Sequence, residues 1–311
     1  MIKYDVIIIG GGPAGISAAI YCKRSNLNVC ILDSYVVGGN PNNYLEIENY
    51  PGFGKIETQK LVEHFTTHLD SLEIPYKEFV NILNIDTNNK IIKTEEDEYA
   101  YQYLMIATGS KPKMLNIPGE QEHVGKGVHY CAICDGPLYK DKEVAVIGGG
   151  NSACEEALGL SKICKRVHIV EFTDKLNADK TTIDKICNTK NILIYTNFQV
   201  TKIADLDEQD KQFYGVDGKK LMLEAQSVSS KQEPILWLLV DGIFPYIGLE
   251  ANVPDINVEK DNYGFIKVDE NMETSLKDVY AIGDVTSEKY RQVVTAVADG
   301  AIAAISISKK Q

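Results

Sequence analysis

The chain has 311 residues, of which 44% are hydrophobic and 24% charged, a composition typical of a globular protein with room for two domains. Its formal net charge of −12, with no long basic stripe to offset it, argues against a nucleic-acid partner. No apolar run approaches the roughly 18 residues of a membrane span and the N-terminus lacks the layout of a signal peptide, so we expect a cytoplasmic protein without a membrane segment.

The N-terminal residues predict a strand, a helix and a second strand. Residues 4–10 contain a continuous β-branched run, Val6-Ile7-Ile8-Ile9, as expected of a parallel strand that is buried on both faces. A helix is expected over residues 15–24 and a second strand over 28–33. The loop between the first strand and the helix is rich in glycine and reads Gly10-Gly11-Gly12-Pro13-Ala14-Gly15.

This glycine loop predicts a dinucleotide site. Gly10 and Gly12 allow a tight turn and let backbone N–H groups approach a pyrophosphate, which the start of the following helix stabilises. Asp33 follows Gly10 by 23 residues and stands at the end of the second strand, where it can accept hydrogen bonds from ribose hydroxyls. The agreement of strand, loop, helix and acidic residue disfavours a mere glycine turn.

The strand–helix–strand pattern occurs a second time. A strand is expected over residues 103–110, followed by a linker at 111–113, and then a second unit with strands at 144–148 and 167–171 around a helix at about 152–161. This duplication indicates an α/β protein with two doubly wound, Rossmann-like domains. A β-rich stretch with a loop at about 205–218 follows, and residues 279–284 with a helix at about 292–308 are expected to return to the first domain.

A dithiol motif, Cys131-Ala132-Ile133-Cys134-Asp135-Gly136, stands between the two glycine loops. Cys-x-x-Cys spacing lets two sulfurs meet at a helix start, where the dipole favours a thiolate. Zinc would require a second pair of ligands, and no second Cys-x-x-Cys occurs, so we expect redox use and no metal site. Asp135 alone is compatible with an ordinary turn or a helix cap, and His129 with a polar neighbour outside the catalytic set.

The other five cysteines are expected to be buried free thiols. We place one in a strand and the rest in helical stretches; they are Cys22, Cys30, Cys154, Cys164 and Cys187.

Several remote segments, taken together with the dithiol motif, resemble the FAD-binding pieces of the low-molecular-weight thioredoxin reductases over essentially the whole chain. These segments are Gly38-Gly39, Glu48-Asn49-Tyr50-Pro51-Gly52, Ala107-Thr108-Gly109, Val279-Tyr280-Ala281-Ile282-Gly283-Asp284 and Tyr290-Arg291-Gln292. The resemblance implies a homodimeric flavoprotein that reduces thioredoxin or a thioredoxin-like protein. It also implies an FAD domain of residues 1–113 and 246–311, and an inserted NAD(P)-like domain of residues 114–245 that carries the dithiol.

The same resemblance implies roles for individual residues. Asp284 would hydrogen-bond the flavin ribityl chain, and Arg291 and Gln292 would border the isoalloxazine ring. Cys134 would be the sulfur nearer the flavin and Asp135 the general acid and base of the dithiol. The remaining FAD contacts would be Gly10, Gly12, Pro13, Ala14, Gly15, Asp33, Gly39, Asn40, Asn49, Ala107, Thr108, Gly109 and Gly283. Asn40 stands where the family commonly has Gln.

The second glycine loop is intact but its phosphate clamp is missing. Gly148, Gly150 and Ala153 form a G-x-G-x-x-A motif with Asn151 and Ser152 between them, and Glu171 follows Gly148 by 23 residues. NADPH-dependent relatives carry a His-Arg-Arg-x-x-x-Arg segment here, whereas this chain reads Glu171-Phe172-Thr173-Asp174-Lys175-Leu176-Asn177. Because Glu171 would repel a 2′-phosphate, NADPH is a poor candidate, and Lys175 replaces the lost guanidinium groups poorly.

Two electron donors stay open from the sequence. Glu171 can accept from a free 2′-hydroxyl, which would make NADH the donor. Ferredoxin is the alternative, because some anaerobe reductases resembling this family use it and have degenerate arginine motifs. An FAD-dependent dithiol oxidase is the rival enzyme, and a non-catalytic redox-sensing module is the rival of another class. Peroxiredoxin-linked relatives carry an extra thioredoxin-like region before the flavin strand. This sequence begins directly at that strand, so we do not expect it to have their activity.

Overall fold

The computed structural model describes residues 1–44, 46–206, 212, 220–229, 235–286 and 291–310. The chain divides into two units, one made of Met1–Lys111 with Glu250–Gln311 and the other of Pro112–Leu249. The C-terminal segment therefore rejoins the N-terminal unit. The division lies within a few residues of the borders expected after residues 113 and 245.

The first unit is built on a seven-stranded sheet in the order β5-β2-β1-β8-β7-β6, with β18 beside β8. Strand β1 pairs in parallel with both β2 and β8, and its last four residues are buried, so it lies at the centre as its β-branched run predicts. The strands are β1 Ile2–Ile9, β2 Val29–Leu32, β5 Tyr76–Lys77, β6 Ile82–Asp86, β7 Ile91–Thr94, β8 Glu98–Ile106 and β18 Val279–Ala281. A separate antiparallel pair is formed by β3 Glu46–Ile47 and β4 Ile56–Glu57.

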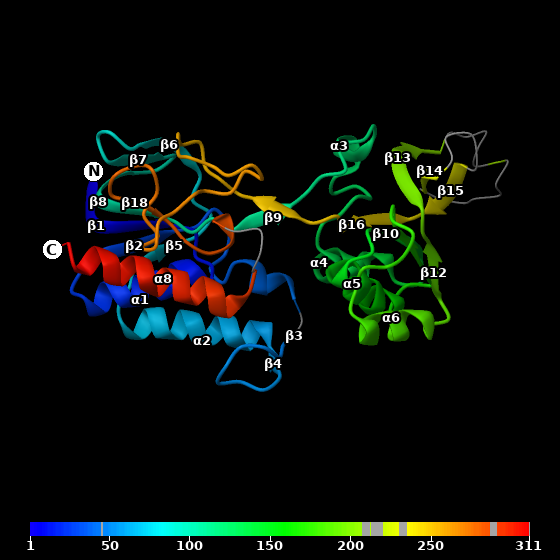
Figure 1. Ribbon diagram of the computed structural model, residues 1–311, viewed down its shortest axis with the longest axis horizontal. Helices are drawn as coiled ribbons and strands as arrows, with labels where there is room; N and C mark the ends of the chain where they lie inside the picture. Colours follow the sequence, from blue (N-terminus) through cyan, green and yellow to red (C-terminus); the bar gives the residue numbers. More distant parts are fainter. Residues whose placement is uncertain (45, 207–211, 213–219, 230–234, 287–290, 311) are drawn as a thin grey trace. The chain divides into compact units, whose positions relative to one another are not determined.

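Helices cover one face of this sheet and a loop segment covers the other. The helices α1, α2 and α8 lie together on one side (Figure 1), and small residues of α1 and α8 share a core with Val6, Ile8 and Ile31. On the other face Ile7, Ile9 and Leu104 pack against Val258 and Ile266. The helical elements are α1 Pro13–Arg24, α2 Thr58–Ser71, α8 Val293–Ser308 and the short 3-10 turns η1 Asn40–Asn43 and η3 Gly283–Val285.

The second unit repeats the parallel arrangement with a smaller sheet, ordered β12-β11-β10-β16. Residues of α5 and α6 pack on one face, and an antiparallel sheet ordered β13-β14-β15 packs on the other. The strands are β10 Glu143–Ile147, β11 Arg166–Val170, β12 Ile192–Tyr195, β13 Phe198–Asp205, β14 Leu221–Ser227, β15 Ile235–Val240 and β16 Gly242–Pro245. The helical elements are α3 Glu120–His123, α4 Ala132–Asp135, η2 Gly136–Tyr139, α5 Asn151–Ser161 and α6 Lys180–Cys187.

The structure corrects several local expectations. The expected linker at 111–113 is partly a strand, because β9 Ser110–Pro112 pairs with β17 Leu249–Ala251. Cys164 lies beyond the end of α5 and is not helical, although it is buried. Cys187 is exposed, which contradicts its expected burial, because it is the last residue of the amphipathic helix α6. Tyr290 and most of the predicted loop at 205–218 lie outside the described residues.

Within the part of the chain that the structure describes, no helix has both the length and the apolar character that crossing a membrane requires.

Candidate active site and dinucleotide sites

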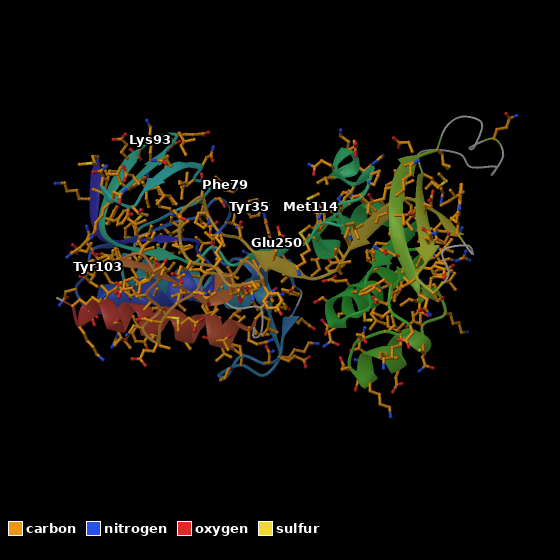
Figure 2. All side chains as sticks on the ribbon, turned by 45° about the horizontal axis from the view of Figure 1, so that its top comes forward. Tyr35, Phe79, Lys93, Tyr103, Met114 and Glu250 are labelled. Carbon is orange, nitrogen blue, oxygen red and sulfur yellow. A yellow bond between two sulfur atoms is a disulfide. The ribbon has the colours of Figure 1, made fainter. Side chains whose placement is uncertain are left out.

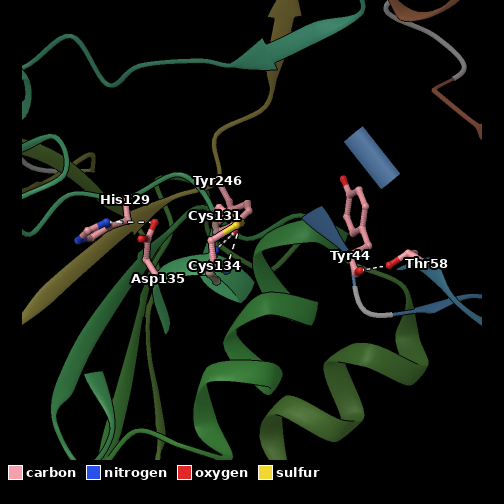
Figure 3. Close-up of a disulfide and its surroundings, with 8 residues drawn as sticks. Tyr44, Thr58, His129, Cys131, Cys134, Asp135 and Tyr246 are labelled. Atoms are coloured by element: carbon pink, nitrogen blue, oxygen red, sulfur yellow. Dashed lines mark hydrogen bonds and ion pairs between the residues drawn. A yellow bond between two sulfur atoms is a disulfide. The ribbon is translucent and has the colours of Figure 1, made fainter. Parts of the chain in front are cut away.

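The dithiol motif forms a disulfide at the start of a short helix. Cys131 is the residue before α4, and its sulfur is bonded to that of Cys134 with the Cα atoms 5.3 Å apart, so the predicted bond is present (Figure 3). The backbone N–H of Cys134 points at the Cys131 sulfur over 3.2 Å. The hydroxyl of Tyr246, just after β16, accepts from the backbone N–H of Ala132 over 2.9 Å. The strand β16 thus anchors the turn that carries the disulfide.

Asp135 has a histidine partner that the sequence prediction left out of the site. Its Oδ2 atom lies 3.1 Å from Nδ1 of His129, and Nε2 of the same ring lies 2.7 Å from the hydroxyl of Tyr139 (Figure 3 draws His129 and Asp135). His129 and Tyr139 are buried, whereas 34% of the Asp135 side chain is exposed. Sequence reasoning missed this contact because His129, Asp135 and Tyr139 come together only when the turn is folded.

Glycines from two segments, together with the backbone of Ala107 from a third segment, meet at the start of α1. A Cβ atom on Gly10 would lie 2.3 Å from the carbonyl oxygen of Ala107, and one on Gly15 would lie 2.0 Å from that of Gly10. A Cβ on Gly39 would lie 2.8 Å from Cα of Gly12. Close backbone packing therefore demands glycine at Gly10, Gly15 and Gly39, and brings the predicted pieces around one helix N-terminus, where Pro13 is the first helical residue.

Gly12 is different, because the atom nearest to an added Cβ would be 3.8 Å away. Its backbone is extended, with φ −74°, so protein packing does not require glycine there. A ligand that lies close to the Gly12 backbone would explain why glycine is present there.

Asp33 is tied to the glycine loop. One carboxylate oxygen accepts from the backbone N–H of Gly11 over 2.5 Å, and the other accepts from that of Tyr35 over 2.7 Å. The sequence predicted a ribose partner at this position, and the structure shows that the same carboxylate also shapes the loop that a pyrophosphate would meet.

Two further groups of predicted FAD residues converge. Asn40 Nδ2 lies 3.4 Å from the hydroxyl of Ser110, which in turn lies 3.4 Å from Oδ2 of Asp284. Asn49 Nδ2 donates to Oε1 of Gln292 over 2.8 Å. Burial raises the pKa of Asp284, while the positive charge of Arg291 opposes that shift.

The turn after β8 contains an unsatisfied group. Among the described residues, the buried hydroxyl of Thr108 has no hydrogen-bond partner, although a buried hydroxyl normally has one. Thr108 belongs to the turn of Ala107 and Gly109 that closes over Gly10. A glycine cradle, an acidic residue and a hydroxyl that lacks a partner fit an extended dinucleotide lying along this loop.

An exposed aromatic pair flanks the same region. Tyr35 and Phe79 are 69% and 66% exposed, and their rings meet edge to face with centroids 5.8 Å apart (Figure 2 labels both). The backbone N–H of Phe79 donates to the carbonyl of Tyr35, two residues beyond Asp33. Neither residue belongs to the motifs that predict the dinucleotide site from the sequence.

The second glycine loop, Gly148 to Ala153, has a backbone geometry similar to that of the first loop. Gly148 has φ +121°, and a Cβ there would lie 2.3 Å from the carbonyl of Tyr246, as at Gly10. A Cβ on Gly149 would meet Glu171 at 2.8 Å, and Gly150 has open space around it. Asn151 and Ser152 begin α5, where Asn151 Oδ1 accepts from the backbone N–H of Asp179 over 2.7 Å, and Ala153 is buried.

Glu171 is buried beside this loop, with only 3% of its surface exposed. Its Oε1 atom accepts from the backbone N–H of Thr173 over 2.9 Å and lies 2.7 Å from the Thr173 hydroxyl. Lys175 is exposed. A carboxylate held in this way presents negative charge next to the loop.

Among the described residues, no cluster of three or more His, Cys, Asp or Glu side chains is arranged to hold a metal ion.

The chain is similar over nearly its full length to proteins of known kind. Residues 4–300 match the family model of pyridine nucleotide-disulphide oxidoreductases. The thioredoxin reductase of Mycoplasma genitalium is 37% identical, with 98% of this chain and 94% of that one covered. The crystal structure of T. acidophilum thioredoxin reductase has a TM-score of 0.86 at 36% identity, covering 100% of this chain and 99% of that one.

A ferredoxin-flavin thioredoxin reductase from Clostridium acetobutylicum is also similar in structure, with a TM-score of 0.52 at 29% identity and coverage of 100% and 98%.

Proposed function

The chain belongs to the pyridine nucleotide-disulphide oxidoreductase family, and from this membership and the geometry of its dithiol we propose that it is an FAD-dependent thioredoxin-disulfide reductase. The observation that carries the proposal is the Cys131–Cys134 disulfide with Asp135 beside it, in a unit that shares its fold with thioredoxin reductases. The dithiol oxidase has no comparable support among the relatives described above.

FAD is assigned to the first unit. Its pyrophosphate would lie along Gly10 to Gly15, with Asp33 at a ribose and Asp284 at the ribityl chain. The open space at Gly12 and the unsatisfied hydroxyl of Thr108 support this placement, because each is explained by a ligand close to the loop. When bound, FAD supplies a two-electron carrier that is compatible with disulfide chemistry.

The dithiol then performs thiol–disulfide exchange. One thiolate of the Cys131–Cys134 pair attacks a sulfur of the substrate disulfide, whose S–S bond breaks, and the remaining thiol of the pair resolves the mixed disulfide. Two electrons and two protons leave the pair, so the substrate becomes a dithiol and the Cys131–Cys134 bond forms again. Asp135 takes the proton from an attacking thiol and returns one to a leaving thiolate. We infer that Cys134 is the sulfur nearer the flavin.

We propose that the electron donor is not NADPH. The buried carboxylate of Glu171 supplies negative charge at the loop where a 2′-phosphate would need guanidinium groups, and the nearby Lys175 is a single exposed ammonium. NADH and reduced ferredoxin are the two candidates. An intact glycine loop at Gly148 to Ala153 supports NADH, and the likeness to a ferredoxin-flavin thioredoxin reductase supports ferredoxin.

An anaerobic titration tests the donor. The purified flavoprotein is mixed in turn with NADH, NADPH and reduced ferredoxin, and flavin bleaching is followed in a stopped-flow spectrophotometer. We expect rapid bleaching by NADH or by ferredoxin and slow bleaching by NADPH. Rapid reduction by micromolar NADPH would overturn the assignment and would mean that Lys175 or another cation binds the phosphate.

A homodimer is expected from the family and is checked by light scattering on the eluted protein. Transfer of electrons to oxygen in place of thioredoxin in the same preparation would favour the dithiol oxidase.

A further inference from the structure

His129 occupies a fixed position between Asp135 and Tyr139. The backbone N–H of His129 donates to the carbonyl of Ile243 over 2.9 Å, which ties it to β16. Its ring stacks on Phe244 with centroids 5.8 Å apart, and the ring of Tyr139 meets the same phenylalanine edge to face at 5.6 Å. The imidazole therefore has little freedom to rotate away from Asp135.

The packing around Tyr139 has a second constraint. A Cβ atom on Gly242, the first residue of β16, would lie 2.5 Å from Cε1 of the Tyr139 ring. Only glycine leaves the space that the ring occupies. Strand β16 thus holds His129 by a backbone hydrogen bond and leaves room for the Tyr139 ring at Gly242, which has no side chain.

The hydrogen-bond directions follow from the chemistry of the three groups. Burial, together with the charges of Asp135 and Asp241, raises the pKa of Tyr139 to about 12, so its hydroxyl keeps its proton at neutral pH. A neutral imidazole with its proton on Nε2 would turn a bare Nδ1 lone pair toward the Asp135 carboxylate, which is repulsive. The favourable arrangement has Tyr139 O–H donating to Nε2 and Nδ1–H donating to Asp135.

We propose that His129 is a positioning residue for the dithiol chemistry: its Nδ1–H, fixed by Tyr139, holds the Asp135 carboxylate in place to exchange protons with the Cys131–Cys134 pair. This inference rests on the proposed function of that pair. His129 itself neither gains nor loses a proton in the step. Asp135 removes the proton from the attacking thiol, the S–S bond of the substrate breaks as the mixed disulfide forms, and Asp135 returns the proton to the departing thiolate.

The test uses a small disulfide, so that it does not depend on thioredoxin or on the electron donor. The holoenzyme is reduced with dithionite, desalted anaerobically and mixed with 5,5′-dithiobis(2-nitrobenzoate), whose released thiolate is followed by absorbance. All proteins carry Cys187→Ser, because Cys187 is an exposed thiol that would react as well. The parent is compared with His129→Phe, His129→Asn, Asp135→Asn and the double variant His129→Phe/Asp135→Asn.

We expect His129→Phe, which keeps an aromatic ring on Phe244, to slow exchange about 10- to 100-fold, the usual value of a hydrogen bond to a charged group. His129→Asn should recover most of the rate, because its amide N–H can replace Nδ1–H. In the Asp135→Asn background, His129→Phe should change the rate less than twofold, since the histidine acts only through the carboxylate.

A matched control is available in His168. This buried histidine also faces a carboxylate, with Nε2 3.5 Å from Glu143, and also stacks on an aromatic ring, Tyr195, at 5.8 Å. His168→Phe should leave the exchange rate within twofold of the parent. If His129→Phe does not fold, as judged by near-UV circular dichroism, His129→Asn and Tyr139→Phe carry the comparison, and Tyr139→Phe should slow exchange a few-fold in the parent and not in Asp135→Asn.

Equal slowing by His129→Phe in both backgrounds would overturn the proposal, because it would indicate a merely structural role. A His129→Phe variant that exchanges as fast as the parent would also overturn it. An Asp135→Asn variant with the parent rate would overturn it as well. A parent that exchanges with the small disulfide but does not reduce thioredoxin would contradict the proposed function alone. Normal thioredoxin turnover without coupling between His129 and Asp135 would contradict this inference alone.

Discussion

Asn49 donates from Nδ2 to Oε1 of Gln292 over 2.8 Å, although 243 positions separate the two residues in the chain. Gln292 is the N-cap of α8 and closes a capping box with Thr295, so the asparagine is joined to the start of a helix. The bond links the loop between β3 and β4 to the start of the C-terminal helix, and both Asn49 and Gln292 are residues that we expect to contact FAD. This convergence supports one FAD site built from both ends of the chain.

Gly12→Ala should weaken FAD binding at least tenfold while the apoprotein keeps its stability. The added methyl group has no protein atom within about 3.8 Å, but it would intrude on a pyrophosphate close to the backbone. Flavin absorbance after dialysis measures the loss. Gly150→Ala is the matched control, because Gly150 has the same open space in the other loop, and it should leave flavin content unchanged. Equal flavin loss in both variants would contradict the assignment of FAD to the first unit.

Glu171→Gln should relax discrimination against NADPH without disturbing the fold. The amide oxygen can still accept from the backbone N–H of Thr173, while the negative charge that repels a 2′-phosphate is removed. We expect NADPH to bleach the flavin roughly tenfold faster than in the parent, and stopped-flow reduction measures it. Glu171→Ala, which loses the Thr173 contact too, should in addition weaken NADH if NADH is the donor. An unchanged ratio of NADH to NADPH rates in both variants would argue for ferredoxin.

Stability should fall as the pH rises from about 4.5 to about 7, because burial and the neighbouring charge of Glu155 raise the pKa of Glu156 from 4.5 to about 7. In this interval the unfolded chain ionises Glu156 before the folded chain does, so the folded state is penalised and the penalty is complete above the higher pKa. Glu156→Gln should weaken this dependence, to which the raised pKa values of Glu155, Asp284 and Asp299 also contribute, and should raise the free energy of unfolding at pH 8 by at most about 3 kcal/mol.

Urea unfolding at pH 5 and pH 8 measures this effect. Glu63→Gln, at an exposed glutamate of α2, serves as the control and should show the parental pH dependence. A Glu156→Gln variant with an undiminished pH dependence would assign the effect to other groups.

Iodoacetamide should label the oxidised native protein at Cys187 and spare the other free cysteines. Burial raises the pKa of the Cys22 thiol to about 12 and that of the Cys30, Cys154 and Cys164 thiols to about 11, and none of these four is exposed. Peptide mass spectrometry identifies the labelled site, and Cys187→Ser should abolish labelling until the disulfide is reduced. Rapid labelling of Cys154 in the folded protein would contradict its burial.

The parts of the fold that could be predicted depend on local patterns. The β-branched run around Ile7, the glycine loops and the acidic residues Asp33 and Glu171 lie within one strand–helix–strand unit each, so short-range rules apply to them. Contacts and exposure that depend on the tertiary structure could not be predicted in this way. His129 meets Phe244 only because β16 lies beside it in the folded protein, and the exposure of Cys187 depends on which side of α6 faces the core. No periodicity in the chain encodes such long-range contacts.

We propose that electrons leave the flavin through the Cys131–Cys134 pair. The most direct measurement is an anaerobic single turnover, in which dithionite-reduced enzyme is mixed with oxidised thioredoxin and the new thioredoxin thiols are counted. We predict that the parent and Cys187→Ser form thioredoxin dithiol, whereas Cys134→Ser keeps its FAD and forms none beyond a mixed disulfide. Normal thioredoxin reduction by Cys134→Ser would contradict the account.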